Sequence, residues 1–414
     1  MTIDTRVSRQ RATLRSVYAV RGFLVLVLVA FQSLEVSDSF VRVAGTGLWV
    51  MPVWSVAALF ALAGFTAMRG VERRGISGIT MRAVTRYLPA LVLVVVVTAY
   101  AIGVAVTTEP RQSYLIDGNV VSYLLNIFGI VRFTLPGVFE FNASAGEVNP
   151  TLWLVPVGYA AAVILVVTTL RARWTTVLLA AIGLVLAAAG VGLDLADVDL
   201  GNADGVLSLL LVGKGLCALV SFIAGAFMYR VRRSVPIDWR AAVVFALLAL
   251  VVAAVSDPSW SSVPLLNAGI AIPLAYLAIY ASSWPWPFRR LAPRIAPLLW
   301  RILLLSYPIQ QLVIALGPDR QNVVVNLSLS LPIILALSGA EWFLLERPLL
   351  RRFFPALLPA DPESAPGRWP DARGYVQQAR ATLPLLVGAV LVIFLMLAAL
   401  AITMFAMQRD AGGV

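Results

Sequence analysis

The stretch from Arg21 to Glu35 contains the residues best suited to chemistry. It reads RGFLVLVLVAFQSLE, so an arginine is followed by ten uncharged residues, then by Gln32 and, three residues later, by Glu35. Eleven residues make about three turns of an α-helix, which predicts that Arg21 and Gln32 project from one side, roughly 16 Å apart along the axis. A guanidinium is suited to phosphate binding and a carboxylate to proton transfer. A carboxamide can only donate and accept hydrogen bonds.

The composition predicts that this helix belongs to an integral membrane protein. Hydrophobic residues make up 60% of the 414 residues and charged residues only 13%, which is far from the composition of a soluble domain. Apolar runs of about 20 residues recur along the chain, and each is long enough to cross the hydrocarbon core of a bilayer. We expect an all-α fold with eleven spans, at about 17–34, 48–69, 86–107, 150–170, 175–193, 205–229, 241–256, 264–282, 297–316, 322–345 and 383–407.

The distribution of charge predicts the orientation of these spans. The net charge is +11, but the arginines gather in short clusters between alternate apolar runs, and acidic residues gather in the other loops. This pattern is typical of cytoplasmic loops beside anionic lipid and gives no indication of nucleic-acid binding. It places the amino terminus in the cytoplasm and the carboxyl terminus outside the plasma membrane. No small-residue cleavage site follows the first helix, so we expect that helix to be retained.

Three stretches need a separate interpretation. The apolar stretch at about 119–134 is short and has acidic residues on both sides, so we expect a re-entrant or buried half-helix at the outer side of the membrane. Residues 355–381 are rich in Pro, Ala, Arg and acidic residues and are predicted to be a cytoplasmic linker. Residues 382–414 are predicted to form an additional transmembrane helix with a short outside tail. The preceding residues, 1–354, then form one transmembrane domain.

Several fragments within residues 15–354 resemble the membrane acyltransferase-3 family. The first helix of that family carries an arginine, ten residues and a histidine, whereas this chain has Gln32 at the histidine position and no histidine anywhere. The later fragments keep the family's order: LAGF at 62–65, the arginine-rich 82–89, TLW at 151–153, SYPI at 306–309 and ERP at 346–348. Ala63 and Gly158 stand where members carry a serine and a glutamate. The resemblance implies a polytopic bundle of ten family-like transmembrane helices, to which the C-terminal helix is an addition.

The resemblance also implies a division of roles. Family members move an acyl group from a cytoplasmic donor, generally acyl-CoA, to an envelope sugar or lipid. By position, Arg21, Arg82 and Arg86 would hold the phosphates of the donor. Gln32 cannot act as the base that the histidine provides, and Glu35, one turn further along, is a possible substitute. No other cofactor and no metal is implied, and Cys217 is the only cysteine.

Each of these residues has an alternative structural role. Arg21 could snorkel to the lipid headgroups, Arg82 and Arg86 could be ordinary loop charges, and Glu35 could be a hydrated charge at the outer interface. Lys214 is expected near the middle of the span 205–229, between two glycines, where an ammonium is costly. It would pair with a carboxylate such as Glu341, which also lies within a span, or contact an anionic headgroup.

Three classes of function remain open from the sequence. The first is an O-acyltransferase with a base other than histidine, acting on an envelope glycan or glycolipid. The second is a pseudoenzyme of the same fold, which keeps a donor or lipid pocket and serves as a subunit, scaffold or lipid-handling partner of another membrane protein. The third is a transporter or flippase for a glycolipid. The absence of histidine favours the second class.

Overall fold

The part of the chain that the structure describes is predominantly helical. The computed structural model describes residues 3–37, 39, 46–144, 146–196, 206–211, 213–232, 234, 237–255, 264–317 and 322–353. Within these residues there is no β-strand, and the single β-bridge joins Thr134 to Glu147. The predicted linker at 355–381 and the predicted C-terminal helix lie outside the described residues.

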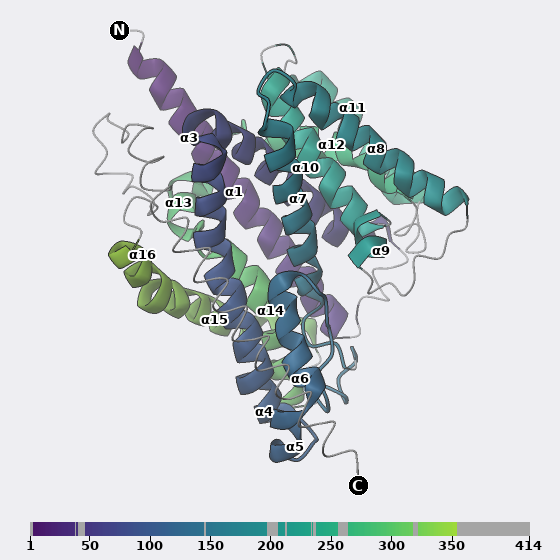
Figure 1. The fold of residues 1–414 in the computed structure, drawn as a ribbon, viewed down its shortest axis with the longest axis vertical. Helices are drawn as coiled ribbons and strands as arrows, with labels where there is room; N and C mark the ends of the chain where they lie inside the picture. Colours follow the sequence, from purple (N-terminus) through teal and green to yellow (C-terminus); the bar gives the residue numbers. More distant parts are fainter. Residues whose placement is uncertain are drawn as a thin grey trace.

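The longer helices lie at the apolar runs that the sequence predicts as spans. They are α1 (Ile3–Val36), α3 (Met51–Val97), α7 (Leu154–Thr169), α8 (Thr175–Leu195), α10 (Lys214–Val231), α11 (Trp239–Val255), α12 (Pro264–Ala281), α14 (Leu299–Ala315) and α15 (Val323–Ala340). Figure 1 shows them as a bundle, with the N-terminus at one end of the molecule and the short helices α4 (Gly103–Val106), α5 (Arg111–Ile116) and α6 (Gly118–Tyr123) at the other.

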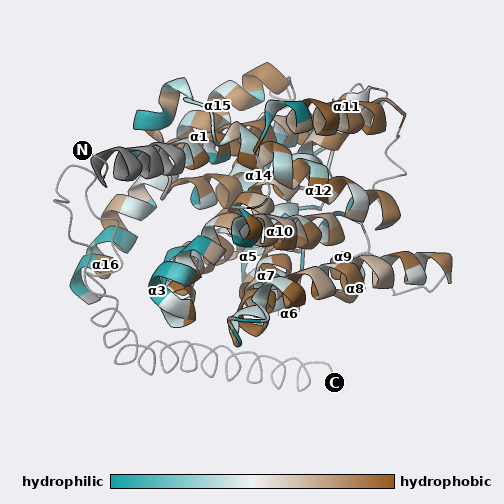
Figure 2. Ribbon diagram, turned by 90° about the horizontal axis from the view of Figure 1, so that it is seen from above, coloured by the Kyte–Doolittle hydropathy of each residue, from teal (hydrophilic) through white to brown (hydrophobic). Residues whose placement is uncertain are grey.

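The described helices are compatible with a membrane protein by length and composition. Six helical segments are long and apolar enough to cross a bilayer, and four further apolar helices are shorter. The ten transmembrane helices predicted within residues 1–354 are therefore not confirmed by these lengths, and their number stays a prediction. Figure 2 shows that α8 and α11 are mostly hydrophobic, and many of their large apolar side chains are exposed, among them Leu184, Val185, Val244 and Leu250. Exposed apolar faces of this extent are typical of surfaces that contact lipid or another protein.

Helix α3 corresponds to two predicted spans rather than one. Its residues are helical except at Gly75, where φ is 74°. A Cβ atom at Gly70 would overlap the side chain of Ile79, so the chain folds back sharply at this bend. The arginine-rich segment predicted as a loop is thus helical, and it continues into the π-helix η2 (Thr98–Ile102) and α4.

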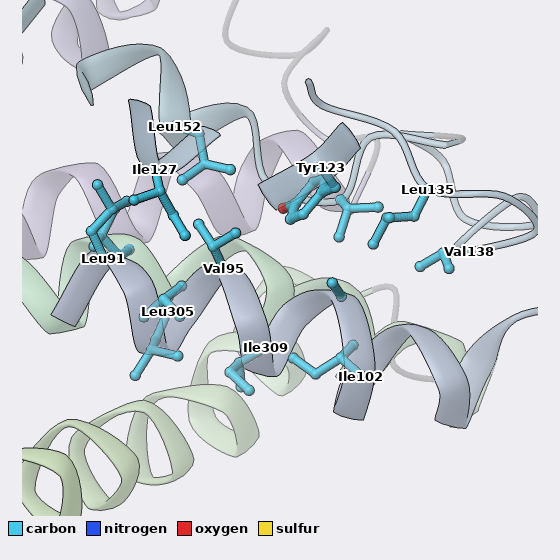
Figure 3. Close-up of a cluster of buried hydrophobic side chains, with 14 of the residues drawn as sticks. Leu91, Val95, Ile102, Tyr123, Ile127, Leu135, Val138, Leu152, Leu305 and Ile309 are labelled. Atoms are coloured by element: carbon cyan, nitrogen blue, oxygen red, sulfur yellow. The ribbon is translucent and has the colours of Figure 1, made fainter. Parts of the chain in front are cut away.

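The segment at 119–134 has the short helix that was predicted for it. The six-residue α6 is followed by a five-residue 3-10 helix, η3 (Leu124–Phe128), which ends at Gly129 with φ 83°. This is far too short for the roughly 20 residues that a crossing helix needs. Figure 3 shows Tyr123 and Ile127 of this segment packed against Leu91 and Val95 of α3 and Leu305 of α14. The half-helix is therefore buried in protein.

The bundle is held together most closely where α3 meets α10. A Cβ atom at Gly64 of α3 would overlap the carbonyl oxygen of Phe222, and one at Gly225 of α10 would overlap that of Ala61. The two backbones approach each other closely because both helices have a glycine at the contact. Small residues allow such packing between helices in membranes, where the van der Waals contact of close surfaces drives association.

Candidate functional site

Gln32 is half-buried and lies between two other elements, an arrangement called here the Gln32 slot. Its Nε2 donates a hydrogen bond to Thr151 Oγ1 at 3.0 Å, and its Oε1 accepts one from Ser306 Oγ. Thr151 lies on the 3-10 helix η4 (Pro150–Trp153), and Ser306 lies on α14. Both ends of the carboxamide are therefore engaged by hydroxyl groups. Both hydroxyls come from fragments that the sequence analysis singled out.

Arg21 points from α1 towards the first half of α3. Its guanidinium donates to the carbonyl oxygen of Leu62 at 2.8 Å and to Thr66 Oγ1 at 2.7 Å. The side chain is half-buried. Thr66 Oγ1 in turn donates to the same carbonyl oxygen of Leu62 at 2.7 Å. Arg21 is thus bound to protein groups rather than extended along the outside of its helix.

Arg82 and Arg86 lie one turn apart on the second half of α3, and both are half-buried. Arg86 donates to the carbonyl oxygen of Ala296, which precedes α14, at 2.6 Å. Its Nε is buried and makes no hydrogen bond among the described residues. Arg86 also interacts electrostatically with Arg21. Arg21 and Arg86 are therefore close enough to interact electrostatically, although they lie on different helices.

Glu35 and Lys214 lie near each other, together with Glu147. Lys214 interacts electrostatically with both carboxylates, and its Nζ lies 5.1 Å from the centre of the Trp153 ring. Such a distance allows a cation–π contact. Glu35 and Lys214 are both exposed. This group lies beside the Gln32 slot, because Trp153 and Thr151 belong to the same 3-10 helix.

The continuous helix predicted around Lys214 is wrong. The predicted span 205–229 is interrupted, and α9 (Val206–Leu211) ends before Gly213, whose φ is 68°. Lys214 is the first residue of α10 rather than a residue in the middle of one helix. A glycine at a positive φ breaks the helix at this point and turns the lysine towards Trp153. The expected pairing with Glu341 is also wrong, because that carboxylate contacts Arg301.

Arg301 is a buried charged residue that was not predicted from the sequence. This residue lies near the start of α14 and is 0% exposed. Its Nε is 3.3 Å from Glu341 Oε1, and its Nη2 contacts Glu346 Oε2. Its Nη1 donates to the carbonyl oxygen of Pro297. The available signal was the presence of Arg301 and Glu341 within two apolar runs, with Glu346 directly after the second run, which is rare enough to suggest a buried ion cluster.

The described helices are compatible with an all-α protein that crosses a membrane several times. The described residues contain no group of three or more side chains suited to binding a metal ion. In comparisons with known proteins, no family model, no curated protein and no solved structure matches this chain. The geometry of the site is therefore the only guide to the chemistry that it can perform.

Proposed function

We propose that this chain is an acyltransferase-3-like membrane protein of the cell envelope that binds a phosphate-bearing acyl donor or lipid but transfers no acyl group. In this proposal it is a pseudoenzyme and serves as a subunit, scaffold or lipid-handling partner of another membrane protein. The observation that carries the proposal is the bonding of Gln32, the residue at the position of the family histidine.

The hydrogen bonds of Gln32 support the proposal that its side chain is held in place and takes no part in proton transfer. Thr151 and Ser306 hold the amide nitrogen and the amide oxygen, respectively. A carboxamide has no proton to exchange near neutral pH, so this slot cannot supply a general base. The same two contacts also support the resemblance itself. They join the first helix to two further fragments of the family pattern, which are distant in sequence.

The arginines support the retention of an anion site. Arg21 and Arg86 are half-buried, come from different helices and interact electrostatically with each other. Placing two like charges together is unfavourable unless a counter-charge is available. The phosphates of a donor such as acyl-CoA would supply that charge, and guanidinium groups suit phosphate well. Arg82, one turn from Arg86, would extend the same site.

The position of Glu35 supports an active enzyme as the second candidate function. Glu35 is exposed, lies one turn beyond Gln32 and interacts electrostatically with Lys214 and Glu147. A carboxylate in this position can be reached by an acceptor hydroxyl, and Lys214 could help to orient the acceptor. In this alternative, Glu35 would replace the missing histidine as the base.

Binding and turnover of radiolabelled acetyl-CoA by the purified protein distinguish the two candidates. We expect wild-type protein to bind the compound without hydrolysing it or transferring its acetyl group. Arg86→Gln should weaken binding about tenfold or more, because one charge-assisted phosphate contact contributes roughly 1.5–3 kcal/mol. Arg111→Gln, at the exposed start of α5, is the matched control and should bind normally.

Two results would contradict the pseudoenzyme. Turnover by the wild type that Glu35→Gln abolishes would identify an active enzyme with a carboxylate base. If the purified protein melts cooperatively, and is therefore folded, but does not bind acetyl-CoA at all, then it has no pocket for this donor.

A further inference from the structure

A buried ion cluster joins α14 to the end of α15. Arg301 contributes the guanidinium, and Glu341 and Glu346 contribute two carboxylates, at 0%, 6% and 3% exposure. Nε of Arg301 is 3.3 Å from Glu341, and Nη2 contacts Glu346. The ring of Trp342 covers the guanidinium, with its centre 5.1 Å from Cζ. Solvent therefore screens none of these three charges appreciably.

The helix geometry explains why two carboxylates meet one guanidinium. Residues five apart in an α-helix point about 140° away from each other. Glu341 and Glu346 are instead the first and last residues of the π-helix η8 (Glu341–Glu346). Its wider turn brings residues five apart close to the same face, and π-helical turns are rare and frequent at functional sites. The π-helical turn thus allows the carboxylates of both Glu341 and Glu346 to contact Arg301.

The charges in this cluster do not balance. One guanidinium faces two carboxylates, so the fully ionised group has a net charge of −1 in a buried position, where an uncompensated charge is strongly unfavourable. Arg86 of α3 is the charged neighbour on the other side and interacts electrostatically with Arg301. It is half-buried and bound to Ala296, and Arg347 of α16 (Arg347–Phe353) lies over the ring of Phe343 instead. Neither is in ion-pair contact with the two carboxylates.

We propose that Glu341 and Glu346 form a proton-binding site and hold one proton between them at neutral pH, while Arg301 keeps its charge. Two carboxylates that share a site cannot both ionise easily, so one proton restores neutrality. The oxygens of Glu346 make no hydrogen bond apart from the ion-pair contact, which leaves them available to accept a proton. Buried carboxylates that compete for one cation in this way are suited to holding a proton.

The infrared spectrum of purified full-length protein at neutral pH tests this inference. The wild type should show the C=O stretching band of one protonated carboxylic acid. Glu341→Gln and Glu346→Gln should each remove that band, because an uncharged amide takes the place of the protonated acid and the remaining carboxylate then pairs with Arg301. Each single variant should also keep its melting temperature within about 2 °C of the wild type. Glu109→Gln, at an exposed residue, is the matched control and should retain the band.

The outcomes that overturn the inference are equally distinct. If neither variant loses a carboxylic-acid band relative to the wild type, both carboxylates are ionised and the site holds no proton. If only one variant loses it, the proton belongs to a single residue and the two carboxylates do not share it. Because both single variants leave one carboxylate for Arg301, the test does not depend on a variant with an unpaired buried charge.

Discussion

At the scale of single residues, the two hydrogen bonds of Gln32 indicate which side chains its position can accept. A neutral imidazole has one donor and one acceptor, and a carboxamide can present the same pair. The slot between Thr151 and Ser306 requires a donor on one side and an acceptor on the other. Glutamine therefore satisfies the hydrogen bonds that a histidine would make there, while removing the group that could carry a proton.

This complementarity predicts the effect of substitutions at Gln32. Gln32→Leu should lower the free energy of unfolding by about 1–3 kcal/mol, because the partly buried hydroxyl of Thr151 loses its donor. Ser306 is less affected, since its hydroxyl also donates to the carbonyl oxygen of Leu303 at 2.9 Å. Gln32→His should be close to wild type in stability. Thermal unfolding in detergent measures both effects, and equal destabilisation by Leu and His would refute the hydrogen-bonded slot.

At the scale of helices, the contact between α3 and α10 depends on two glycines that face opposite backbones. Gly64 lies against Phe222, and Gly225 lies against Ala61. Neither position has room for a methyl group, because the obstructing atoms are backbone carbonyl groups that cannot rotate away. The close approach is therefore a property of the pair of helices rather than of one flexible side chain.

Gly225→Ala should consequently destabilise the protein. Forcing a methyl group into a well-packed contact typically costs about 1–3 kcal/mol, and here the backbones themselves must separate. Gly158→Ala is the control, because a Cβ at Gly158 of α7 meets no atom within 4 Å. It should be neutral or stabilising by up to about 1 kcal/mol, since alanine favours a helix over glycine. Similar melting temperatures for the two variants would contradict the packing described for α3 and α10.

The sequence predicted helix positions well and ion partners poorly, for a physical reason. Helices in such a chain follow from long apolar runs, which are a local property. The partners of Arg301 lie about 40 residues further along, and both reach it only because η8 is a π-helix. Hydropathy likewise did not reveal the break before Lys214, which depends on the conformation of Gly213. For the candidate site, position on α1 and the family pattern selected Gln32 and Arg21, but their partners required the fold.

At the scale of the whole molecule, polar groups gather towards two opposite ends of the bundle. The bend of α3 carries Glu72, which pairs with Arg230 at 3.2 Å and Arg232 at 3.1 Å. The opposite end contains α4, α5 and α6, far from the N-terminus (Figure 1). Helices α8 and α11 are mostly hydrophobic (Figure 2), and many of their large apolar side chains are exposed. The positions of the arginines in the sequence predict that the end with the bend of α3 faces the cytoplasm, and this orientation stays a prediction.

The orientation can be tested by labelling single cysteines with a membrane-impermeant reagent. Cys217 is buried and should give little background in intact cells. Gln112→Cys and Phe141→Cys lie on exposed residues before and after the half-helix α6–η3, so both should be labelled from outside. Arg173→Cys, at an exposed residue between α7 and α8, should be labelled only after the cells are lysed, because arginine-rich loops are retained in the cytoplasm. Labelling of Gln112→Cys without Phe141→Cys would mean that the segment between them crosses the membrane, and labelling of Arg173→Cys in intact cells would reverse the orientation.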